Sequence, residues 1–335
     1  MDLAIKVRRY DPESDQSESY WQDYKVEVDD SFTVLDALIK VREEIDGTLS
    51  LRCSCRSAIC GSCSMRVNGH ASLACKVKAS DSVKGSEPLV IEPMGNMPVI
   101  KDLIVEMKSF WQKIESVDPW LQPSGPEPEG EYIAPNEDMV HLAGVMNCIM
   151  CGACVSDCTA LEGDPNFLGP AALAKAYRFV ADPRDGATND RLEKLSQSSY
   201  FSNSSDPENF SGIWDCTRCM ECVERCPKDV DPMERIMALR GRAMDAGYDN
   251  TIGARHTKVF ENSVSHSGRL NELMLPIKTF GMFNILAMLN MAPVGIRALL
   301  HGKMPSIIHK PIHNAKNVRK LANMVKKLRA KGRGE

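Results

Sequence analysis

The sequence predicts an α+β chain with a strand-rich domain at the N-terminus, an all-helical domain in the middle and a helical extension at the C-terminus. Three observations predict it. Residues 3–9 and 20–28 have the composition of strands and flank a polar loop, which indicates a hairpin. Beyond about residue 137 the composition is that of helices. The thirteen cysteines fall into three groups, one in the first part of the chain and two in the second.

The first 105 residues have the order of elements of a β-grasp ferredoxin domain. After the hairpin, Thr33 can cap a helix over residues 34–45, whose apolar positions share one face. A loop that carries cysteines follows, and then a second hairpin with strands at 65–69 and 75–77.

Three further regions complete the predicted organisation. Residues 106–136 are expected to be a linker, because 119–135 is rich in proline and acidic residues and has no periodicity. Residues 137–250 are expected to form an α-helical ferredoxin domain, and residues 251–335 a helical, basic extension that docks a partner or a membrane. The helical segments expected in the middle domain are 138–147, 170–181, 188–197 and 232–246.

Composition indicates a globular protein with two or three small domains, because 43% of the 335 residues are hydrophobic and 26% are charged. The net charge of −4 gives no indication of nucleic-acid binding, although residues 301–333 are crowded with Lys, Arg and His. The sequence contains no run of eighteen uncharged apolar residues, so we expect no membrane-spanning helix.

The first cysteine group has the spacing of a [2Fe-2S] centre. It follows the plant-type ferredoxin pattern of C-x4-C-x2-C with a distant fourth cysteine. The four expected ligands are Cys55, Cys60, Cys63 and Cys75. Cys53 stands two residues before this set, which is complete without it. We expect Cys53 to be a buried thiol without a role, with exchange of ligand between Cys53 and Cys55 as the alternative.

The second and third groups each run C-x2-C-x2-C-x3-C, which is the rhythm of bacterial ferredoxins with two [4Fe-4S] clusters. In that pattern the fourth cysteine of each run turns away to the neighbouring cluster, so we expect the ligands to cross over. One cluster takes Cys148, Cys151, Cys154 and Cys226, and the other takes Cys158, Cys216, Cys219 and Cys222.

Structural zinc and disulfides are the alternatives for these cysteines. Zinc ligands normally come as two pairs separated by a knuckle-length gap, and not as runs of four with one rhythm. Disulfides are disfavoured because no signal peptide precedes the first strand, and clustered cysteines in a reducing compartment are ligands or nucleophiles. Iron-sulfur clusters therefore explain the spacings best.

Three stretches resemble the iron-sulfur subunit of succinate dehydrogenase and fumarate reductase: residues 55–63 (CRSAICGSC), 92–103 (EPMGNMPVIKDL) and 169–185 (GPAALAKAYRFVADPRD). The likeness covers about residues 1–245. It implies a subunit of a succinate:quinone or quinol:fumarate oxidoreductase that takes electrons from an FAD-bearing subunit through the [2Fe-2S] centre, the middle cubane and the third cluster. Substrate chemistry would lie on the flavoprotein, and this chain would have no catalytic residue of its own.

Two sites depart from the common pattern of that family. Better-known members have an apolar residue at the position of Cys219 and hold a [3Fe-4S] third cluster; the restored cysteine predicts [4Fe-4S], with [3Fe-4S] as the alternative if Cys219 is not a ligand. The family's quinone pocket uses a proline and a tryptophan soon after the cysteine matching Cys158, and a histidine after the one matching Cys216. This chain has TALEG at 159–163 and Thr217 there, which puts direct quinone binding by the usual pocket in doubt.

The C-terminal segment resembles the tail of the C subunit of heterodisulfide reductase over about residues 250–320, through HTKVF at 256–260, SGRLNEL at 267–273 and GKM at 302–304. Helices of that subunit dock a partner built of cysteine-rich CCG domains. The likeness implies transfer from the third cluster to a CCG-domain, membrane-associated subunit, and only indirectly to quinone. We expect a peripheral position on the cytoplasmic face of the membrane, because no signal peptide is seen. The apolar stretch at 280–300 is compatible with packing against the partner or with interfacial membrane contact.

Two other functions fit parts of the pattern. An electron-transfer subunit of another flavin dehydrogenase, or of a heterodisulfide-reductase-like complex, also uses twin cubane motifs, but the β-grasp domain and residues 169–185 argue against it. An iron-sulfur redox sensor is the second alternative. Three clusters in one chain favour conduction over sensing.

Overall fold

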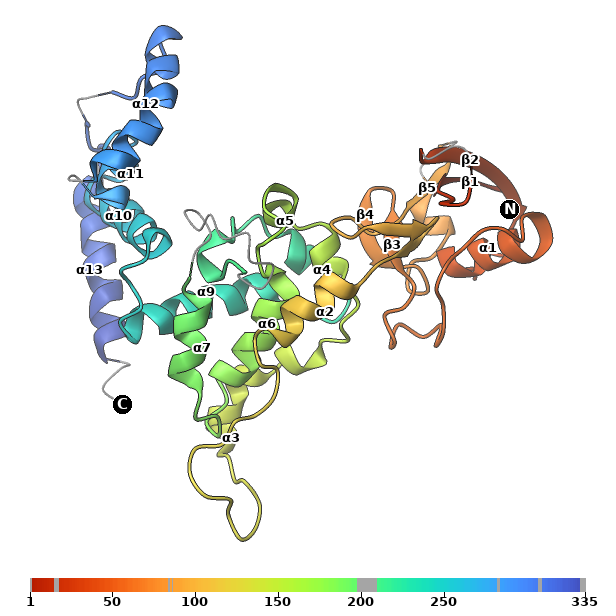
Figure 1. Ribbon diagram of the computed structural model, residues 1–335, viewed down its shortest axis with the longest axis horizontal. Coiled ribbons are helices and arrows are strands. Elements are labelled where there is room, and N and C mark those ends of the chain that lie inside the picture. The colour runs from red at the N-terminus through yellow and green to blue at the C-terminus, as the bar shows by residue number, and fades with distance from the viewer. Residues whose placement is uncertain are drawn as a thin grey trace. The chain divides into compact units, whose positions relative to one another are not determined.

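The computed structural model describes residues 2–14, 18–83, 85, 87–197, 210–281, 284–306 and 309–331 (Figure 1). The chain divides into two compact units, Met1–Ala246 and Gly247–Glu335, each with its own internal packing. The first unit carries all thirteen cysteines.

A five-stranded mixed sheet forms the N-terminal part of the first unit. Its order is β2-β1-β5-β3-β4, with β1 and β5 parallel and the other neighbours antiparallel. The strands are β1 Asp2–Arg9, β2 Tyr20–Glu27, β3 Ser64–Val67, β4 His70–Leu73 and β5 Leu89–Glu92. β1 and β2 pair continuously from Asp2 opposite Glu27 to Arg9 opposite Tyr20, which confirms the predicted first hairpin.

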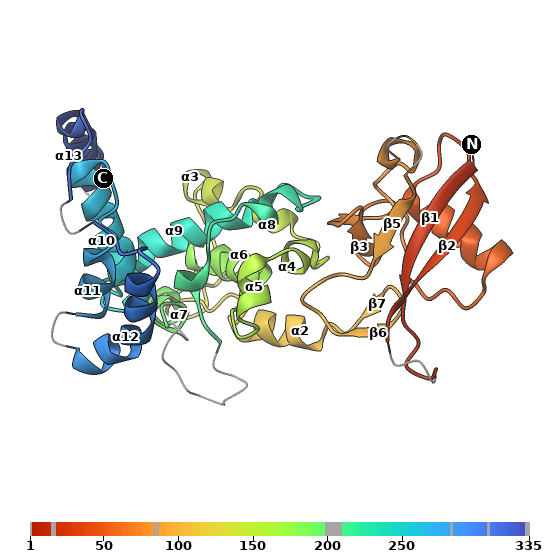
Figure 2. The same cartoon turned by 90° about the horizontal axis from the view of Figure 1, so that it is seen from above.

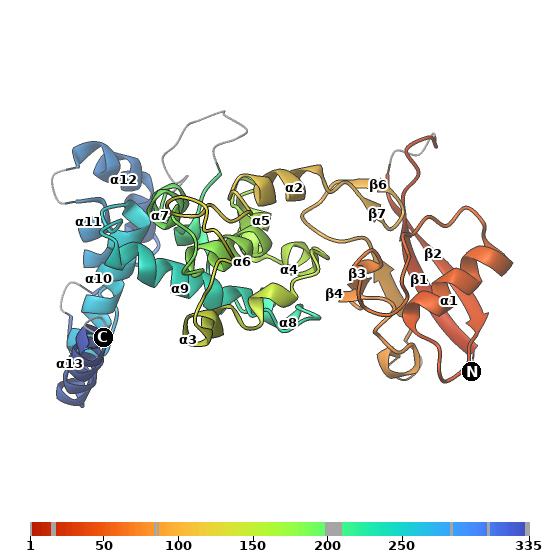
Figure 3. The same cartoon turned by 90° about the horizontal axis from the view of Figure 1, so that it is seen from below.

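Helix α1 (Val34–Lys40) packs against this sheet, as Figure 3 shows, and completes its core. Alternate side chains of β1 point to the helix, as the period of a strand requires. The buried side chains shared by β1 and α1 include Leu3, Ile5, Val7, Val34, Leu35 and Leu38. Thr33 caps the helix as predicted, but beyond Lys40 the chain continues as a π-helical turn, Val41–Ile45. Sheet and helix together form the predicted β-grasp domain.

The predicted second hairpin is wrong in the position of its second strand. That strand is β4, which begins directly after the turn at Asn68 and Gly69, and not at 75–77. Asn68 (φ 50°) and Gly69 (φ 81°) both take the left-handed conformation that a two-residue hairpin turn requires. Cys75 therefore lies just beyond the sheet and faces the cysteine loop that precedes β3.

The segment between the sheet and the helical part contains regular structure. β6 (Val99–Lys101) and β7 (Ile104–Val105) form a small antiparallel pair, and α2 (Lys108–Glu115) follows inside the range predicted to be a linker. α2 packs against α6 (Gly169–Val180) and buries its apolar face there. The proline-rich residues 119–135 contain no helix or strand, only an isolated bridge from Pro123 to Asp185.

Helices enclose the second and third cysteine groups. α6 and α9 (Pro232–Asp245) lie side by side in Figures 2 and 3 and pack against each other, because the buried face of α6 consists largely of alanines that allow close approach. The shorter helices are α3 Asn136–Met139, α4 Ala153–Ser156, α5 Thr159–Gly163, α7 Thr188–Leu195 and α8 Glu221–Glu224. The 3-10 turns are Ser80–Ser82, Val140–Leu142, Val145–Asn147 and Ile213–Asp215.

The structure confirms the helices predicted at 170–181, 188–197 and 232–246 as α6, α7 and α9. The helix predicted at 138–147 is broken into short turns, because Gly144 takes φ 82° and interrupts the helical backbone.

The second unit is helical, as predicted. Its helices are α10 Ile252–Ser267, α11 Met274–Phe280, α12 Ile285–Leu300 and α13 Ala315–Lys331. α10 packs against both α11 and α13, and Arg319 of α13 donates a hydrogen bond to the His266 carbonyl at 2.6 Å. Among the residues that the structure describes, none of the helices has the length and apolar character needed to cross a membrane.

Candidate metal centres

The first cysteine group surrounds the loop between α1 and β3. Cys63 and Cys75 are buried next to the sheet, whereas Cys60 is exposed at the tip of the loop. The Ala58 amide donates to Cys75 Sγ at 3.3 Å, and the Cys60 amide donates to Cys55 Sγ at 3.3 Å. The structure thus brings the four predicted ligands to one rim of the domain.

Backbone N–H groups in this loop point at sulfur atoms. Cys55 Sγ accepts from the amides of Ser57 and Ile59 at 3.3 and 3.4 Å, in addition to that of Cys60. The loop achieves this with left-handed conformations at Arg56 (φ 55°) and Ala58 (φ 55°), which cost a non-glycine residue about 1–2 kcal/mol each. Successive N–H groups turned inward form a concave site for negative charge. The loop therefore fits thiolate sulfurs of a metal cluster.

Two cavities in the helical part are each lined by four cysteines. The first is lined by Cys148, Cys151, Cys154 and Cys226, among apolar neighbours from α6 and α9. The second is lined by Cys158, Cys216, Cys219 and Cys222, again among apolar side chains. In each cavity three cysteines come from one run and the fourth from the other run. None of the thirteen cysteines forms a disulfide.

The two cubane-type loops have the same backbone geometry. Met150 (φ 57°) and Gly152 (φ 80°) take left-handed conformations on either side of Cys151. Arg218 (φ 60°) and Met220 (φ 72°) do so at the matching positions around Cys219. A short helix, α4 or α8, then follows each loop. Met150, Arg218 and Met220 are not glycines, so this conformation costs them backbone energy. Such strain is typical of loops that bind a ligand.

Burial makes these thiols poor acids. It raises the pKa of Cys63 and Cys222 to about 12, and it raises the pKa of Cys154 well above its usual value. Neighbouring cysteines raise these values further, because thiolates crowded in one apolar cavity repel each other. A cation bound among them removes that cost, and metal ligation releases the protons. The donor set therefore fits iron-sulfur clusters, which supply one-electron redox chemistry when bound.

Cys219 differs from the other cubane cysteines because it lies at the surface. Burial opposes its ionisation, but hydrogen bonds from Thr159, the Glu221 backbone and Thr217 lower its pKa overall. The hydroxyl oxygens of Thr159 and Thr217 lie 3.4 Å apart. The structure thus brings together, beside Cys219, two threonines at positions where the resemblance placed a quinone pocket.

Cys53 and Lys76 are neighbours in sequence of the predicted ligands of the first group. Cys53 is half-buried and packs against the β-grasp core, and it is not one of the four predicted ligands. Lys76, next to Cys75, donates to the Pro227 carbonyl at 3.2 Å, directly after Cys226. The residue after Cys75 therefore contacts the residue after Cys226.

Sequence reasoning did not predict the polar contacts that join the sheet domain to the loops of the second and third cysteine groups. Arg66 donates to Asp157 Oδ1 at 2.9 Å and to the Ser156 carbonyl at 2.7 Å. The Ala71 amide donates to Asp157 Oδ2 at 2.7 Å. Asn96 also joins the two parts, because its side chain donates to the Ser156 carbonyl at 3.2 Å. It lies in the stretch 92–103 that the resemblance singled out, which was the available signal for it. Asp157 had no signal except its place next to Cys158.

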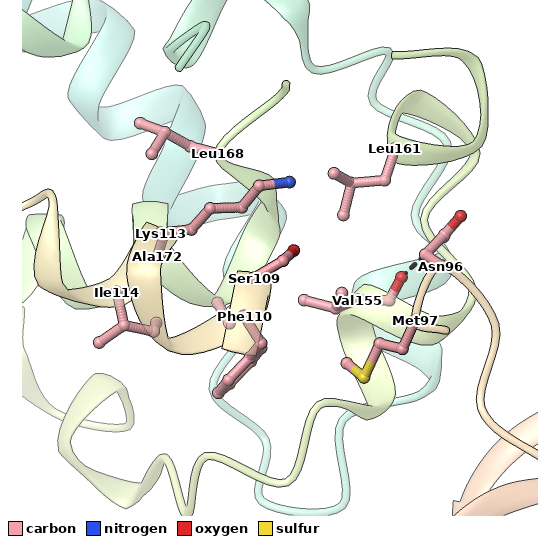
Figure 4. Close-up of a pocket in the computed structure, with 11 residues that line it drawn as sticks. Asn96, Met97, Ser109, Phe110, Lys113, Ile114, Val155, Leu161, Leu168 and Ala172 are labelled. Atoms are coloured by element: carbon pink, nitrogen blue, oxygen red, sulfur yellow. Dashed lines mark hydrogen bonds between the residues drawn. The ribbon is translucent and has the colours of Figure 1, made fainter. Parts of the chain in front are cut away.

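A small pocket beside this junction shows how α2 is held in place (Figure 4). Asn96 and Val155 lie on one side of it, with the Asn96 amide donating to the Val155 carbonyl at 2.8 Å. Lys113 of α2 reaches in from the other side and donates to the Pro165 carbonyl at 2.5 Å. Burial lowers the pKa of Lys113 to about 8. α2 consequently packs with the helical part of the first unit, although it directly follows the sheet domain in sequence.

Comparison with known proteins agrees with this arrangement. Residues 4–112 match the family described as "2Fe-2S iron-sulfur cluster binding domain", and residues 144–230 match the "4Fe-4S dicluster domain". The fumarate reductase iron-sulfur subunit of Mycobacterium tuberculosis is 38% identical over 70% of this chain and 90% of its own length. The succinate dehydrogenase iron-sulfur subunit of Paracoccus denitrificans is 37% identical over 72% of this chain and 88% of its own. A chain of the Mycobacterium smegmatis Sdh1 complex has the same fold, with a TM-score of 0.64 at 24% identity over 74% of this chain and 98% of its own.

The fold and the cysteine sites define an iron-sulfur protein with a [2Fe-2S] cluster binding domain and a [4Fe-4S] dicluster domain. More particularly, the chain belongs to the family of iron-sulfur subunits of succinate dehydrogenase and fumarate reductase, and is an oxidoreductase component. Neither matching domain extends beyond residue 230, so the second unit lies outside both.

Proposed function

We propose that this chain conducts electrons between an FAD-bearing flavoprotein subunit and a CCG-domain, membrane-associated subunit, through one [2Fe-2S] and two [4Fe-4S] clusters. The names of the relatives, which are subunits of succinate dehydrogenase and fumarate reductase, support the flavoprotein partner. The [2Fe-2S] ligands are Cys55, Cys60, Cys63 and Cys75; the middle cubane ligands are Cys148, Cys151, Cys154 and Cys226; the third-cluster ligands are Cys158, Cys216, Cys219 and Cys222.

One observation carries the proposal: each of the two cavities in the helical part is lined by four cysteines, with one exchanged between the runs. Four sulfurs in one cavity match the ligand number of a [4Fe-4S] cluster. The presence of Cys219 among the four favours [4Fe-4S] over [3Fe-4S] at the third site. The apolar walls reduce solvent access, which is one of the ways in which a protein sets a cluster's potential.

The first loop is suited to receive electrons from a partner. Ile59 is 63% exposed and lies directly before the exposed Cys60. An apolar side chain held at the surface next to a cluster ligand is typical of a contact patch between proteins. We infer that the flavoprotein covers this loop and brings its flavin close to the first cluster.

The second unit supports the exit of electrons at a membrane-associated partner. Residues 247–335 contain 15 Lys and Arg but 4 Asp and Glu, although the whole chain has a net charge of −4. α12 exposes several large apolar side chains, including Ile285, Leu286, Leu289, Leu299 and Leu300. A basic segment with an exposed apolar helix fits a partner subunit that sits on an anionic membrane surface. We infer a peripheral position for this chain on the cytoplasmic face.

Electron paramagnetic resonance of the native complex, with iron analysis, tests the cluster assignment. We expect succinate to reduce the clusters, no oxidised [3Fe-4S] signal, and about ten iron atoms per chain, the sum for one binuclear and two cubane centres. An oxidised [3Fe-4S] signal would show that Cys219 is not a ligand. A lack of any response to succinate would mean that the flavoprotein partner has been misidentified.

A double substitution on α12 tests the exit partner. Leu286→Glu with Leu289→Glu alters side chains that are 76% and 62% exposed, so folding should be unaffected. We expect the variant to lose co-purification with the CCG-domain subunit while its cluster spectra stay unchanged. Ile133→Glu, at an 87% exposed position of the first unit, is the control. Retained co-purification by the double variant would contradict the docking role of α12.

A further inference from the structure

Gly61 allows the loop of the first cysteine group to contact Cys151, a cysteine of the second group. It lies between Cys60 and Cys63 with φ 74°. A Cβ atom at this position would lie 2.7 Å from Cys151 Cβ and 2.9 Å from Cys151 Cα. These atoms belong to the backbone and the first side-chain carbon, so they cannot rotate out of the way. The approach is therefore possible only because residue 61 has no side chain.

Hydrogen bonds from the sheet domain to one short segment, residues 155–158, stabilise the contact between Gly61 and Cys151. Arg66 donates to Ser156 and Asp157, as described above. The Gly95 amide donates to Ser156 Oγ at 3.0 Å, and Asn96 Nδ2 donates to the Cys158 carbonyl at 3.0 Å. This segment lies between Cys154, which lines one cubane cavity, and Cys158, which lines the other. The bonds thus fix the sheet domain relative to both cavities.

Gly95 shows the same closeness on the other side of the junction. A Cβ atom there would lie 2.7 Å from the Ser156 carbonyl oxygen and would collide with the Arg66 guanidinium. Two glycines therefore set the separation between the sheet domain and the cubane loops. Gly61 is the one that lies inside a ligand loop.

We propose that Gly61 is a positioning residue that sets the distance between the [2Fe-2S] ligand loop and Cys151, and with it the rate of electron transfer from the first centre to the middle one. This inference rests on the cluster assignment of the proposed function. In the step, the first centre loses one electron and the middle centre gains it; no bond breaks and no proton moves. Because the rate of electron tunnelling falls exponentially with distance, a small separation of the two loops slows the step several-fold.

The test compares Gly61→Ala with Gly69→Ala in the assembled complex. Gly69 also has a left-handed backbone, with φ 81°, but a Cβ atom there would have no neighbour within 4 Å. Both substitutions place an alanine in a left-handed backbone conformation, but only Gly61→Ala forces the two loops apart. Iron content and the spectra of the fully reduced protein show whether the clusters are intact in each variant.

The decisive readouts are the magnetic interaction between the reduced first and middle centres, and the delay between their reduction after succinate is added. We expect Gly61→Ala to retain iron, to show a weaker interaction and to reduce the middle centre several-fold more slowly, while Gly69→Ala matches the unaltered protein. Equal behaviour of Gly61→Ala and the unaltered protein, or an equal loss in Gly69→Ala, overturns the inference.

A second variant covers failure of Gly61→Ala to fold. Asn96→Ala removes the bonds from the Asn96 side chain to the Val155, Ser156 and Cys158 carbonyls without adding an atom at the contact, and we expect a smaller change in the same direction. An unchanged interaction and rate in Asn96→Ala would then overturn the inference. If the unaltered complex itself lacks two interacting centres, the cluster assignment fails instead, so the two failures are distinguishable.

Discussion

At the scale of single residues, Asp182 holds together the turn that follows α6. Its buried carboxylate accepts hydrogen bonds from Arg178 and from both the side chain and the backbone of Arg184. The Arg184 guanidinium and, with it, Arg178 hold the pKa of Asp182 well below its usual range. Burial opposes the charge of this carboxylate, but the two arginines offset that cost, and both of them lose their partner when the carboxylate is removed.

Asp182→Asn should therefore lower the free energy of unfolding by about 2–3 kcal/mol near neutral pH, less than for a fully buried pair because both arginines are partly exposed. The folded pKa lies below the unfolded value of 3.8, so this stability is present above about pH 4 and is lost as the pH falls through the folded pKa. Urea unfolding of both proteins from pH 7 to about pH 2 measures it, and the difference between them should begin to fall below about pH 4. Asp118→Asn, which alters an exposed pair with Lys194, is the control. A constant difference between Asp182→Asn and the unaltered protein at all pH values would contradict the prediction.

Cys219 provides the second test at this scale. Cys219→Ile removes one sulfur from the second cysteine-lined cavity and should convert the proposed third cluster to [3Fe-4S]. The expected results are loss of about one iron atom per chain, a new signal in the oxidised sample, and impaired transfer to the CCG-domain partner. Cys53→Ala, which alters a cysteine outside all three sets, should change none of these. Unaltered spectra and turnover in Cys219→Ile would remove the fourth-ligand role.

The cysteine residues were predictable from the sequence because cluster ligands recur at fixed local spacings. The residues that join the domains were not. Arg66 and Asp157 are 91 positions apart, and nothing local marks either as the partner of the other. Gly61 reads as an ordinary turn glycine until Cys151 is seen beside it.

At the scale of elements, the first turn of α1 is stabilised by a reciprocal cap. Thr33 Oγ1 accepts from the Asp36 amide at 3.2 Å, and Asp36 accepts from the Thr33 amide at 3.0 Å. Thr33 also pairs with Lys78 through an isolated antiparallel bridge. Local sequence was sufficient to predict this cap.

Thr33→Ala should lower the free energy of unfolding by about 1 kcal/mol, because one N-terminal amide of the helix loses its acceptor. Thr33→Ser keeps the hydroxyl and should lose much less. Chemical denaturation of the two variants gives the comparison. Equal losses in both would mean that the methyl group of Thr33, and not its hydroxyl, matters.

The sequence located the long helices correctly, because their hydrophobic pattern extends over many residues, but it misplaced a short strand. α6 and α9 have twelve and fourteen residues, and the sequence located both. β4 has four residues, two of them polar, so its alternation of exposed and buried positions was too short to recognise. The prediction of Cys75 as a ligand did not depend on locating β4, because it rests on cysteine spacing alone.

At the scale of the whole molecule, the cysteines all lie in one of the two units. The first contains every cysteine and the complete β-grasp and helical ferredoxin parts, whereas the second contains none of them. A chain ended at Ala246 should therefore keep its iron content and cluster spectra but lose association with the CCG-domain subunit. Iron analysis and co-purification measure the two properties. Loss of iron in the shortened chain would show that the second unit is needed for cluster assembly.

The exchange of one cysteine between the two cubane cavities has a consequence for how the protein matures. Each cavity lacks a sulfur until the other run has folded beside it, so neither site can be completed ahead of its neighbour. Loading of the two cubanes should then be cooperative. When iron is scarce, such a chain would accumulate as molecules with both cubane clusters or with neither, and few molecules would carry one. Few molecules would then accept electrons that they cannot pass on.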